Sequence, residues 1–415
     1  MRYALYGIVF LIGVYALRHY VFALNRLFGH QRHPYTDIDS ANWPTVTVLI
    51  AAHNEEAVID GALQAVLDVD YPPEQLCIMP INDRSTDRTE ELIDAACARY
   101  PGRITPFHRR EGKPGKAAAL KDAMAFVDSE IIVVFDADYI PSRGLIKQLV
   151  APFFDPAVGA VMGRVVPLNV GSSLLTRLLD LERAGGYQVD QQARMNLGLV
   201  PQYGGTVGGV RVAALREVGG WHDDVLAEDT DLTYRLLLKN WQTVYQNRSE
   251  CYEEVPETWP VRVRQIKRWA KGHNQALFRH AWPLLRHPGI KPAARLDGLL
   301  LLGTYAMAPL LLVGWALSVA LYYFDTEPAL NWVIALFALM SFSALGNFAA
   351  FFEIAAAVHL DGNRQRATLL PLNFLGFLVS VVAITRATLE QTLLDPIFNR
   401  GLHWDKTVRY RRPKP

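Results

Sequence analysis

Long hydrophobic segments lie near both ends of the chain, and a polar region lies between them. These segments cover residues 4–24, 299–324, 329–359 and 367–389. Each is long enough to cross a bilayer, since a helix needs roughly 20 apolar residues to do so. Arg18 lies near the end of the first segment, where we expect its side chain to extend to the membrane interface. The pattern predicts a transmembrane helix within residues 1–25 and transmembrane or interface helices within residues 296–395.

The polar region alternates between strand-like and helix-like stretches. The strand-like stretches are "TVTVLIAA" (45–52), "LCIMPIND" (76–83) and "EIIVVFDAD" (130–138). Helical patterns such as "DRTEELIDAACARY" separate them. This alternation is typical of a mostly parallel sheet with helices on both faces, and such sheets bind ligands beyond the carboxyl ends of their strands. We therefore expect an α/β domain over residues 41–258, inserted between the membrane helices.

The composition supports a membrane protein and excludes several classes. The chain of 415 residues is 51% hydrophobic, and its mean hydropathy of +0.09 is too apolar for an ordinary soluble enzyme. The formal net charge is only +1, which gives no reason to expect a nucleic-acid partner. Three cysteines without metal-ligand spacing are typical of a reducing compartment and predict no disulfide framework.

Basic residues predict the orientation of the polar domain. Several of them, including Arg26, follow the first hydrophobic segment, whereas Arg2 alone precedes it. The positive-inside rule then places the domain in the cytoplasm and the protein in the inner or plasma membrane. Three crossings by the late segments would leave the basic tail, residues 396–415, on the outside, against the same rule. An even number of late crossings, with one segment in the interface, removes this conflict.

Carboxylates at two predicted strand ends are the first chemical signal. Asp136 and Asp138, in "FDADYIP", follow a buried apolar strand, where they can share one divalent cation with a diphosphate. Asp83 ends the strand "CIMPIND" in the same way. A turn aspartate before "RSTD" is an equally good interpretation of Asp83. The pair therefore predicts a metal site, and Asp83 alone does not.

Two further motifs carry candidate residues, and each has an ordinary structural explanation. Lys116 follows a Pro-Gly turn at a predicted helix start, which suits phosphate binding or a solvated basic loop. Glu228 and Asp229 lie in "VLAEDTDLTYRL" (225–236), ahead of the helical pattern in that stretch. Carboxylates in a first turn commonly stabilise the helix dipole, but a general base fits the same place.

The order of the motifs resembles the membrane-bound family 2 glycosyltransferases, which include cellulose, hyaluronan and poly-N-acetylglucosamine synthases. The motifs are "AAHNEE", "INDRSTDRT", "REGKPGKAAAL", "DADYIP", "YGGTVGGVRVAALREVGGW", "LAEDTDL" and "QIKRW". The glycine-rich stretch and "HNQALFRH" look most like the cellulose synthase-like mannan and glucomannan synthases. The resemblance covers roughly residues 45–280 and implies a GT-A glycosyltransferase fold.

The resemblance implies a role for each matching residue. Asp83, Lys116, Gln265 and Arg268 would bind the nucleotide-sugar donor, and Asp136 and Asp138 would hold its diphosphate through Mg²⁺ or Mn²⁺. Asp229 would be the general base. Trp269 would stack on the acceptor sugar, with Glu228 beside the acceptor. The signature Gln-x-x-Arg-Trp lies in residues 259–290, which we expect to form amphipathic interface helices.

The resemblance is incomplete at two places. Arg84 stands where the family more often has a small residue, which leaves the geometry of that loop open. The tail "HWDKTVRY" looks like the family's gating loop, with Trp404, Thr407 and Arg409 in matching places, but it stands at the end of the chain. An ordinary stop-transfer tail is the alternative.

The resemblance favours an inverting, processive glycosyltransferase that builds a β-linked polysaccharide and passes it through the membrane. The alternative enzyme is a lipid glycosyltransferase of the ceramide glucosyltransferase type, which transfers one sugar. A transporter with a cytoplasmic domain is a third class, for which Glu353 and Arg386 are the charged candidates in the late segments. The expected partners are a UDP- or GDP-hexose, a growing glycan or lipid acceptor, and the bilayer. The sequence does not determine the sugar.

Overall fold

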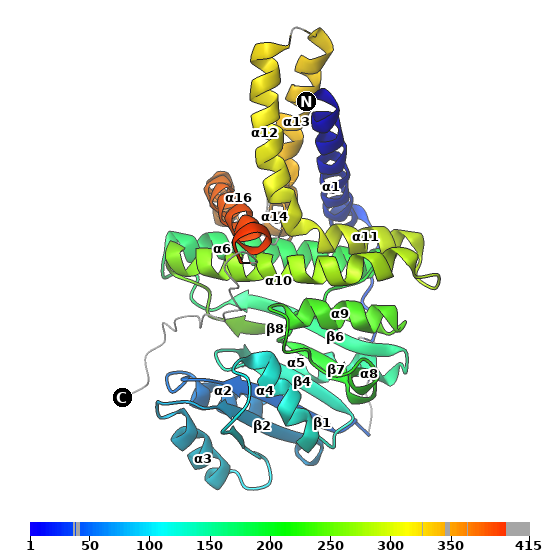
Figure 1. The fold of residues 1–415 in the computed structure, drawn as a ribbon. Helices are drawn as coiled ribbons and strands as arrows, with labels where there is room; N and C mark the ends of the chain where they lie inside the picture. The colour runs from blue at the N-terminus through cyan, green and yellow to red at the C-terminus, as the bar shows by residue number, and fades with distance from the viewer. Residues whose placement is uncertain (36–37, 39–41, 326, 345–348, 363, 396–415) are drawn as a thin grey trace.

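An α/β domain lies beneath a group of upright helices in the computed structural model of this protein (Figure 1). The structure describes residues 1–35, 38, 42–325, 327–344, 349–362 and 364–395. A layer of helices that run across the molecule separates the α/β domain from the upright helices. The predicted gating residues Trp404, Thr407 and Arg409 lie outside the described residues.

Eight strands in the described part of the chain form one mixed sheet, in the order β3-β2-β1-β4-β7-β6-β8-β5. The central strands β1, β2 and β4 run parallel, as the alternating pattern predicts, whereas β7 is antiparallel to β4 and β6. The strands are β1 (Val46–Ala52), β2 (Leu76–Asp83), β3 (Phe107–Arg109), β4 (Ile131–Asp136), β5 (Ile140–Pro141), β6 (Val158–Pro167), β7 (Gly208–Arg211) and β8 (Gln242–Glu253). The predicted fold class, a mostly parallel sheet with flanking helices, is confirmed.

The register of the central strands brings their polar ends to one edge of the sheet. Ala51 pairs with Asp136 at the end of β4, and Ala52 pairs with Asn82, one residue before Asp83. Strands β1 and β4 are apolar and almost wholly buried up to these ends. Helices α2 (Ile59–Leu67), α3 (Thr89–Arg99) and α4 (Lys116–Ala123) connect them. Two aspartates from separate motifs therefore meet beyond the carboxyl end of β1.

Helix α10 (Trp259–Arg286) crosses the domain above this edge as one helix of 28 residues (Figure 1). Its middle contains Gly272, where an added Cβ would lie only 2.6 Å from the Cβ of Ala227. Glycine is therefore needed for α10 to lie directly against the segment that leads into α9 (Glu228–Leu238). This close approach places Gln265, Arg268 and Trp269 near the first turn of α9.

The upright helices are α1 (Arg2–Phe28), α12 (Met307–Phe324) and α13 (Pro328–Ala344), which pack against one another (Figure 1). Arg2 forms ion pairs with Asp325 and Glu327 at the end far from the α/β domain. An added Cβ on Gly314 would lie 2.4 Å from the Phe337 ring and 3.2 Å from Ile8. The three helices are therefore in direct contact along their length.

The structure differs from the simplest interpretation of the hydrophobic segments at two places. Residues 329–359 do not form one helix, because α14 (Phe351–Leu360) starts separately from α13. Glu353 accepts the N–H of Ala350 and so stabilises that second start. The Arg18 side chain does not extend to the interface but is buried, because Asp297 and Asp190 provide carboxylate partners inside the protein.

Helix α16 (Asn373–Leu389) begins and ends near the α/β domain. Before it, Arg366 pairs with Asp180 of α6 (Leu174–Ala184) at 2.7 Å; after it, Glu390 pairs with Lys267 of α10 at 2.8 Å. Among the described residues, the helices long and apolar enough to cross a membrane are Arg2–Phe28, Thr304–Phe324 and Gln365–Leu394. The helical stretch Gln365–Leu394 is long enough to cross a membrane. Its two ends, however, both lie on the side of the molecule where the α/β domain lies. Of the late helices, only α12 and α13 lead away from the domain and back.

Candidate active site

One cavity of about 980 Å³ lies between the sheet edge, α10 and the upright helices. Side chains from motifs spread over almost 190 residues of sequence share its wall. They include every candidate in the described chain that the sequence assigned to a donor, metal, base or acceptor role: Asp83, Lys116, Asp136, Asp138, Glu228, Asp229, Gln265, Arg268 and Trp269. The structure thus brings these residues together, while their individual roles remain predictions.

Asp83 holds the loop that precedes α4. Its carboxylate accepts hydrogen bonds from Arg109 Nη1 at 2.6 Å and from the Gly115 N–H at 3.0 Å. Arg84, which departs from the family pattern, adopts a φ of 57° and donates to both Asp83 and the Gly112 carbonyl. The arginine therefore connects the two loops on this side of the cavity. Asp83 reaches the cavity while these contacts fix its orientation.

Lys116 is the first residue of α4, and its ammonium contacts the end of strand β4. Its Nζ is 2.5 Å from Asp136 Oδ1 and 2.9 Å from the Gly205 carbonyl. Burial lowers the pKa of Lys116, but the charges of Asp136 and Glu228 outweigh this effect, so the pKa is raised overall. The side chain therefore stays cationic, as a phosphate-binding lysine must.

The carboxylates at this end of the cavity fit a divalent cation. Asp136, Asp138, Glu228 and Asp229 all line it, and the Lys116 ammonium is bonded to just one of them among the contacts described. Four carboxylates therefore gather near the strand ends, beside the Lys116 ammonium. Hard cations such as Mg²⁺ and Mn²⁺ prefer carboxylate oxygens, so Asp136 and Asp138 can hold one together with a diphosphate.

Asp229 has the properties of a general base. It is the second residue of α9, and its Oδ1 accepts the N–H of Thr230 at 2.7 Å. Withdrawal from bulk solvent, together with the charge of neighbouring Glu228, raises the pKa of Asp229 to about 7. A base with a pKa near the working pH is the most effective in proton transfer.

The signature on α10 faces the same cavity, but its tryptophan is partly covered. Gln265 Oε1 accepts from Arg262 Nη1 at 2.8 Å. The guanidinium groups of Arg183 and Arg262 lie 5.3 and 5.2 Å from the centre of the Trp269 ring. Trp269 also packs against a hydrophobic cluster that includes residues of the upright helices. A sugar can therefore use only the part of the ring that these neighbours leave open.

Beyond Asp229, the cavity continues toward the upright helices. Its wall there is formed by residues of α1, α12 and α16 that sequence reasoning missed: Tyr15, Arg18, His19, Met307, Ala308, Leu311, Ser380, Val381 and Ile384. The apolar members lie in ordinary hydrophobic segments, so nothing distinguishes them locally. The only signal in the sequence was the pair Arg18-His19 inside an apolar run.

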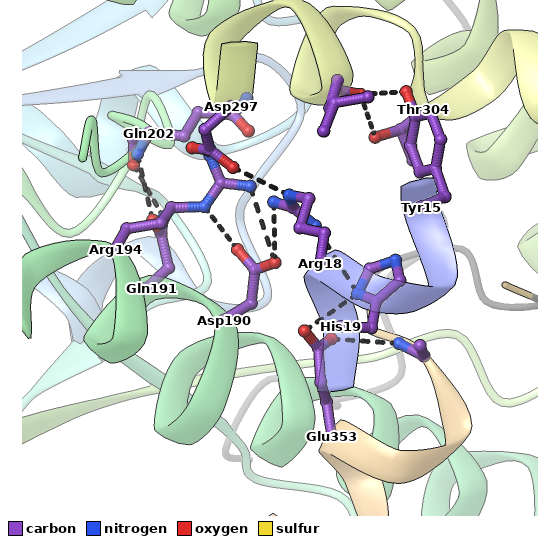
Figure 2. A network of polar contacts seen from close by, with 12 residues as sticks. Tyr15, Arg18, His19, Asp190, Gln191, Arg194, Gln202, Asp297, Thr304 and Glu353 are labelled. Atoms are coloured by element: carbon purple, nitrogen blue, oxygen red, sulfur yellow. Dashed lines mark hydrogen bonds and ion pairs between the residues drawn. The ribbon is translucent and has the colours of Figure 1, made fainter. Parts of the chain in front are cut away.

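Charged residues of separate elements form a network beside this part of the cavity (Figure 2). Arg18 Nε lies 2.7 Å from Asp297 Oδ1, and its Nη2 lies 3.2 Å from Asp190 Oδ2. Arg194 contacts the same two aspartates, at 3.0 and 2.7 Å. The network therefore ties α1 to α11 (Pro292–Leu302), to α7 (Gln192–Leu197) and to the π-helical turn Gly185–Gln191.

Three relatives of known classes are similar to this chain. A probable glycosyltransferase, YdaM of Bacillus subtilis, is 34% identical over 239 residues, or 57% of this chain and 57% of that protein. Beta-monoglucosyldiacylglycerol synthase of Synechocystis is 32% identical over 285 residues (67% and 59%). Glucomannan 4-beta-mannosyltransferase 7 of Arabidopsis thaliana is 29% identical over 259 residues (60% and 46%). The matched regions therefore span about half of these relatives' own lengths.

A solved structure and a family model agree with these similarities. A mannosyltransferase from Pyrobaculum calidifontis, solved with GDP-Man and Mn2+, superposes with a TM-score of 0.62 over 94% of this chain and 98% of that one, at 19% identity. At that identity the likeness shows a shared fold. Residues 44–272, more than half of the chain, match the model described as glycosyltransferase like family 2. As the order of its motifs predicts, the chain belongs to glycosyltransferase family 2.

Proposed function

We propose that the protein transfers a hexosyl group from a nucleotide sugar to an acceptor at the membrane surface, with inversion at the anomeric carbon. The observation that carries this proposal is the single cavity, which joins the carboxylate site of the sheet to apolar side chains of α12 and α16. A donor enters from the aqueous side, and an acceptor with an apolar part can approach from the membrane side. Family membership supports the same reaction class.

The proposed reaction uses the residues around the strand ends. Asp229 takes the proton of the acceptor hydroxyl, whose oxygen forms the new bond to the anomeric carbon as the bond to the diphosphate breaks. Arg268 and Lys116 neutralise charge on the departing nucleoside diphosphate. A Mg²⁺ or Mn²⁺ ion held by Asp136 and Asp138 would supply further positive charge to that diphosphate.

Within this reaction, a membrane lipid is the acceptor that the geometry favours. In the described part of the chain, the cavity wall reaches Tyr15 on α1 and Leu311 on α12. Farther along, Ile12 and Ile8 are buried against the neighbouring helices, where Gly314 contacts Phe337. A glycan chain would not fit between helices packed this closely. A lipid, by contrast, needs only lateral access to the cavity.

Polysaccharide synthesis, which the sequence alone favours, is the second candidate. Its support is the similarity to a protein named glucomannan 4-beta-mannosyltransferase, whereas the synthase of a glucosyldiacylglycerol supports the lipid candidate. A polymer would need an exit path other than the space between α1, α12 and α13. The transporter class loses its sequence support, since Glu353 pairs with His19 and the exposed Arg386 pairs with Glu390.

The product distinguishes the two candidates. The full-length protein in nanodiscs is incubated with radiolabelled UDP- and GDP-hexoses, with diacylglycerol and short β-linked oligosaccharides offered as separate acceptors. We expect label in an organic-soluble lipid that carries one sugar. An Asp229→Asn preparation is the matched control for background transfer. Water-soluble product of increasing length, formed without lipid, would contradict the lipid proposal and favour the polymer.

A further inference from the structure

We propose that His273 is a positioning residue for the general base: acting through Thr230, it determines which carboxylate oxygen of Asp229 receives the acceptor proton. This inference rests on the proposed function, because it assumes that Asp229 is the base. It concerns a histidine to which neither the sequence analysis nor the proposed reaction assigns a role. His273 is the first residue of "HNQALFRH" and lies four residues after Trp269, which ends the Gln-x-x-Arg-Trp signature.

His273 lies on the cavity face of α10. Gln265, Trp269 and His273 follow one another at intervals of four residues and all line the cavity. The His273 ring packs against the ring of Tyr305, with 4.8 Å between their centres. Its Nε2 lies 3.3 Å from Thr230 Oγ1. Thr230 is the residue after Asp229, so the imidazole is one side chain away from the base.

The neighbours of the Thr230 hydroxyl determine where its proton points. A hydroxyl has one proton to donate and two lone pairs to accept with. Gln202 Nε2, at 2.8 Å, can only donate. Ionised Asp229, whose Oδ1 is 3.4 Å away, can only accept. If His273 Nε2 also donates, both lone pairs of the hydroxyl are used, and its single proton is directed to Asp229.

The environment of His273 selects this donating form. His273 Nδ1 is buried and has no hydrogen-bond partner within the described structure, so a proton placed there would be an unpaired buried donor. A proton on Nε2 has Thr230 as its acceptor. Burial lowers the pKa of His273 to about 4, so the ring is neutral and carries only one of the two protons. The neutral ring with its proton on Nε2 is therefore the form that fits.

The consequence for Asp229 is a difference between its two oxygens. Oδ1 receives the Thr230 N–H at 2.7 Å and the Thr230 hydroxyl. Neither of these hydrogen bonds from Thr230 reaches Oδ2. Oδ2 is thus the oxygen left to accept the proton of the acceptor hydroxyl. The titratable groups around this carboxylate come from several elements: Glu228, Lys116, Tyr187, Tyr203 and Tyr305.

The test is the pH dependence of kcat/KM for the full-length protein in nanodiscs. Hydrogen bonds to the ionised form lower the pKa of a carboxyl group, so their loss raises it. In His273→Leu the Thr230 hydroxyl is free to turn away, and we expect the acid limb to move up by about half to one pH unit. Starting from a pKa near 7, this reduces kcat/KM about two- to fivefold at neutral pH and leaves the alkaline plateau unchanged.

Companion variants separate positioning from folding. His273→Gln keeps an amide donor near the place of Nε2 and should keep the wild-type limb, whereas Thr230→Val should shift it as His273→Leu does. UDP and GDP affinity should be unchanged in all three, and exposed Arg264→Gln on the same helix controls for general damage. An unshifted limb in His273→Leu, or equal loss of activity and nucleotide binding in the Leu and Gln variants, would overturn the inference. Full activity in Asp229→Asn would instead overturn the proposed function.

Discussion

The two ends of the cavity contain charged residues in opposite arrangements. At the strand end, the carboxylates of Asp136, Asp138, Glu228 and Asp229 gather around the Lys116 ammonium on the wall of the cavity. At the membrane end, Arg18 and Arg194 are matched by Asp190 and Asp297 in a closed network (Figure 2).

The difference separates residues that are positioned to bind a ligand from residues that stabilise the fold. Like charges held close together destabilise the protein until a cation or substrate joins them, and such places are typical of active sites. Buried charges that are already paired have no such need. We therefore expect changes at the strand end to abolish activity without unfolding, and changes at the membrane end to unfold the protein.

Removal of the divalent cation should have the largest effect. Because Asp136 and Asp138 need a hard cation to bridge the donor diphosphate, a chelator should reduce transfer to background, and Mg²⁺ or Mn²⁺ should restore it. Thermal unfolding should change little. The measurement is nucleotide release and melting temperature on the same sample. Full activity in excess chelator would show that the Lys116 ammonium alone suffices at this end.

Asp229→Asn should cost somewhat less, about 10²- to 10⁴-fold in kcat, because it removes only the proton acceptor. Donor affinity and melting temperature should remain those of the wild type. We would measure transfer rates beside nucleotide binding. If the variant retains more than about a tenth of the wild-type rate, the base is another residue.

Arg18→Met tests the ion-pair network at the membrane end of the cavity. Removal of Arg18 leaves the two carboxylates of Asp190 and Asp297 with only the Arg194 guanidinium between them, and loss of one partner of a buried pair typically costs about 3–5 kcal/mol of stability. Arg386→Met is the matched control, because that arginine is 73% exposed and its pair with Glu390 should contribute less than about 1 kcal/mol. Unfolding in detergent measures both. Equal stability of the two variants would mean that the network does not hold α1.

Trp269→Ala should have the smallest effect of the four. Arg183 and Arg262 already lie over the ring, so a sugar gains only part of a stacking contact. Aromatic contacts contribute roughly 0.5–1.5 kcal/mol beyond area burial, which corresponds to an increase of at most about tenfold in the acceptor KM. Donor affinity should not change. An equal loss of donor affinity would place Trp269 in the donor site or show that α10 is disturbed.

Much of the α/β domain was predictable because its signals are local. Strand β2 has the predicted bounds, 76–83, and Asp136 ends β4 as its apolar run indicates. Parallel strands bring their carboxyl ends to one edge, so a correct prediction of the strands also brings their aspartates together. The candidate site residues needed no knowledge of side-chain contacts beyond this rule and the family resemblance.

The membrane side was less predictable, since hydrophobicity reports a preference for an apolar environment and not a path through it. The composition of α16 is that of a spanning helix, yet the ion pairs of Arg366 and Glu390 hold both its ends on one side. The same limit made the segment 329–359 appear continuous. Polar contacts made by the flanking residues, not the apolar run itself, determine where such a helix lies.

The sequence by itself determined the order of strands and helices, the apolar character of the membrane segments and the carboxylates at the strand ends. Only the tertiary structure decided that Arg18 is buried with Asp297, that α12 lies directly against α1 and α13 at Gly314, and that His273 reaches Thr230. The physical reason is separation along the chain. Periodicity and strand-end chemistry act over a few residues, whereas the contacts of His273 with Thr230 and of Arg18 with Asp297 join positions 43 and 279 residues apart, whose meeting depends on how the whole chain packs.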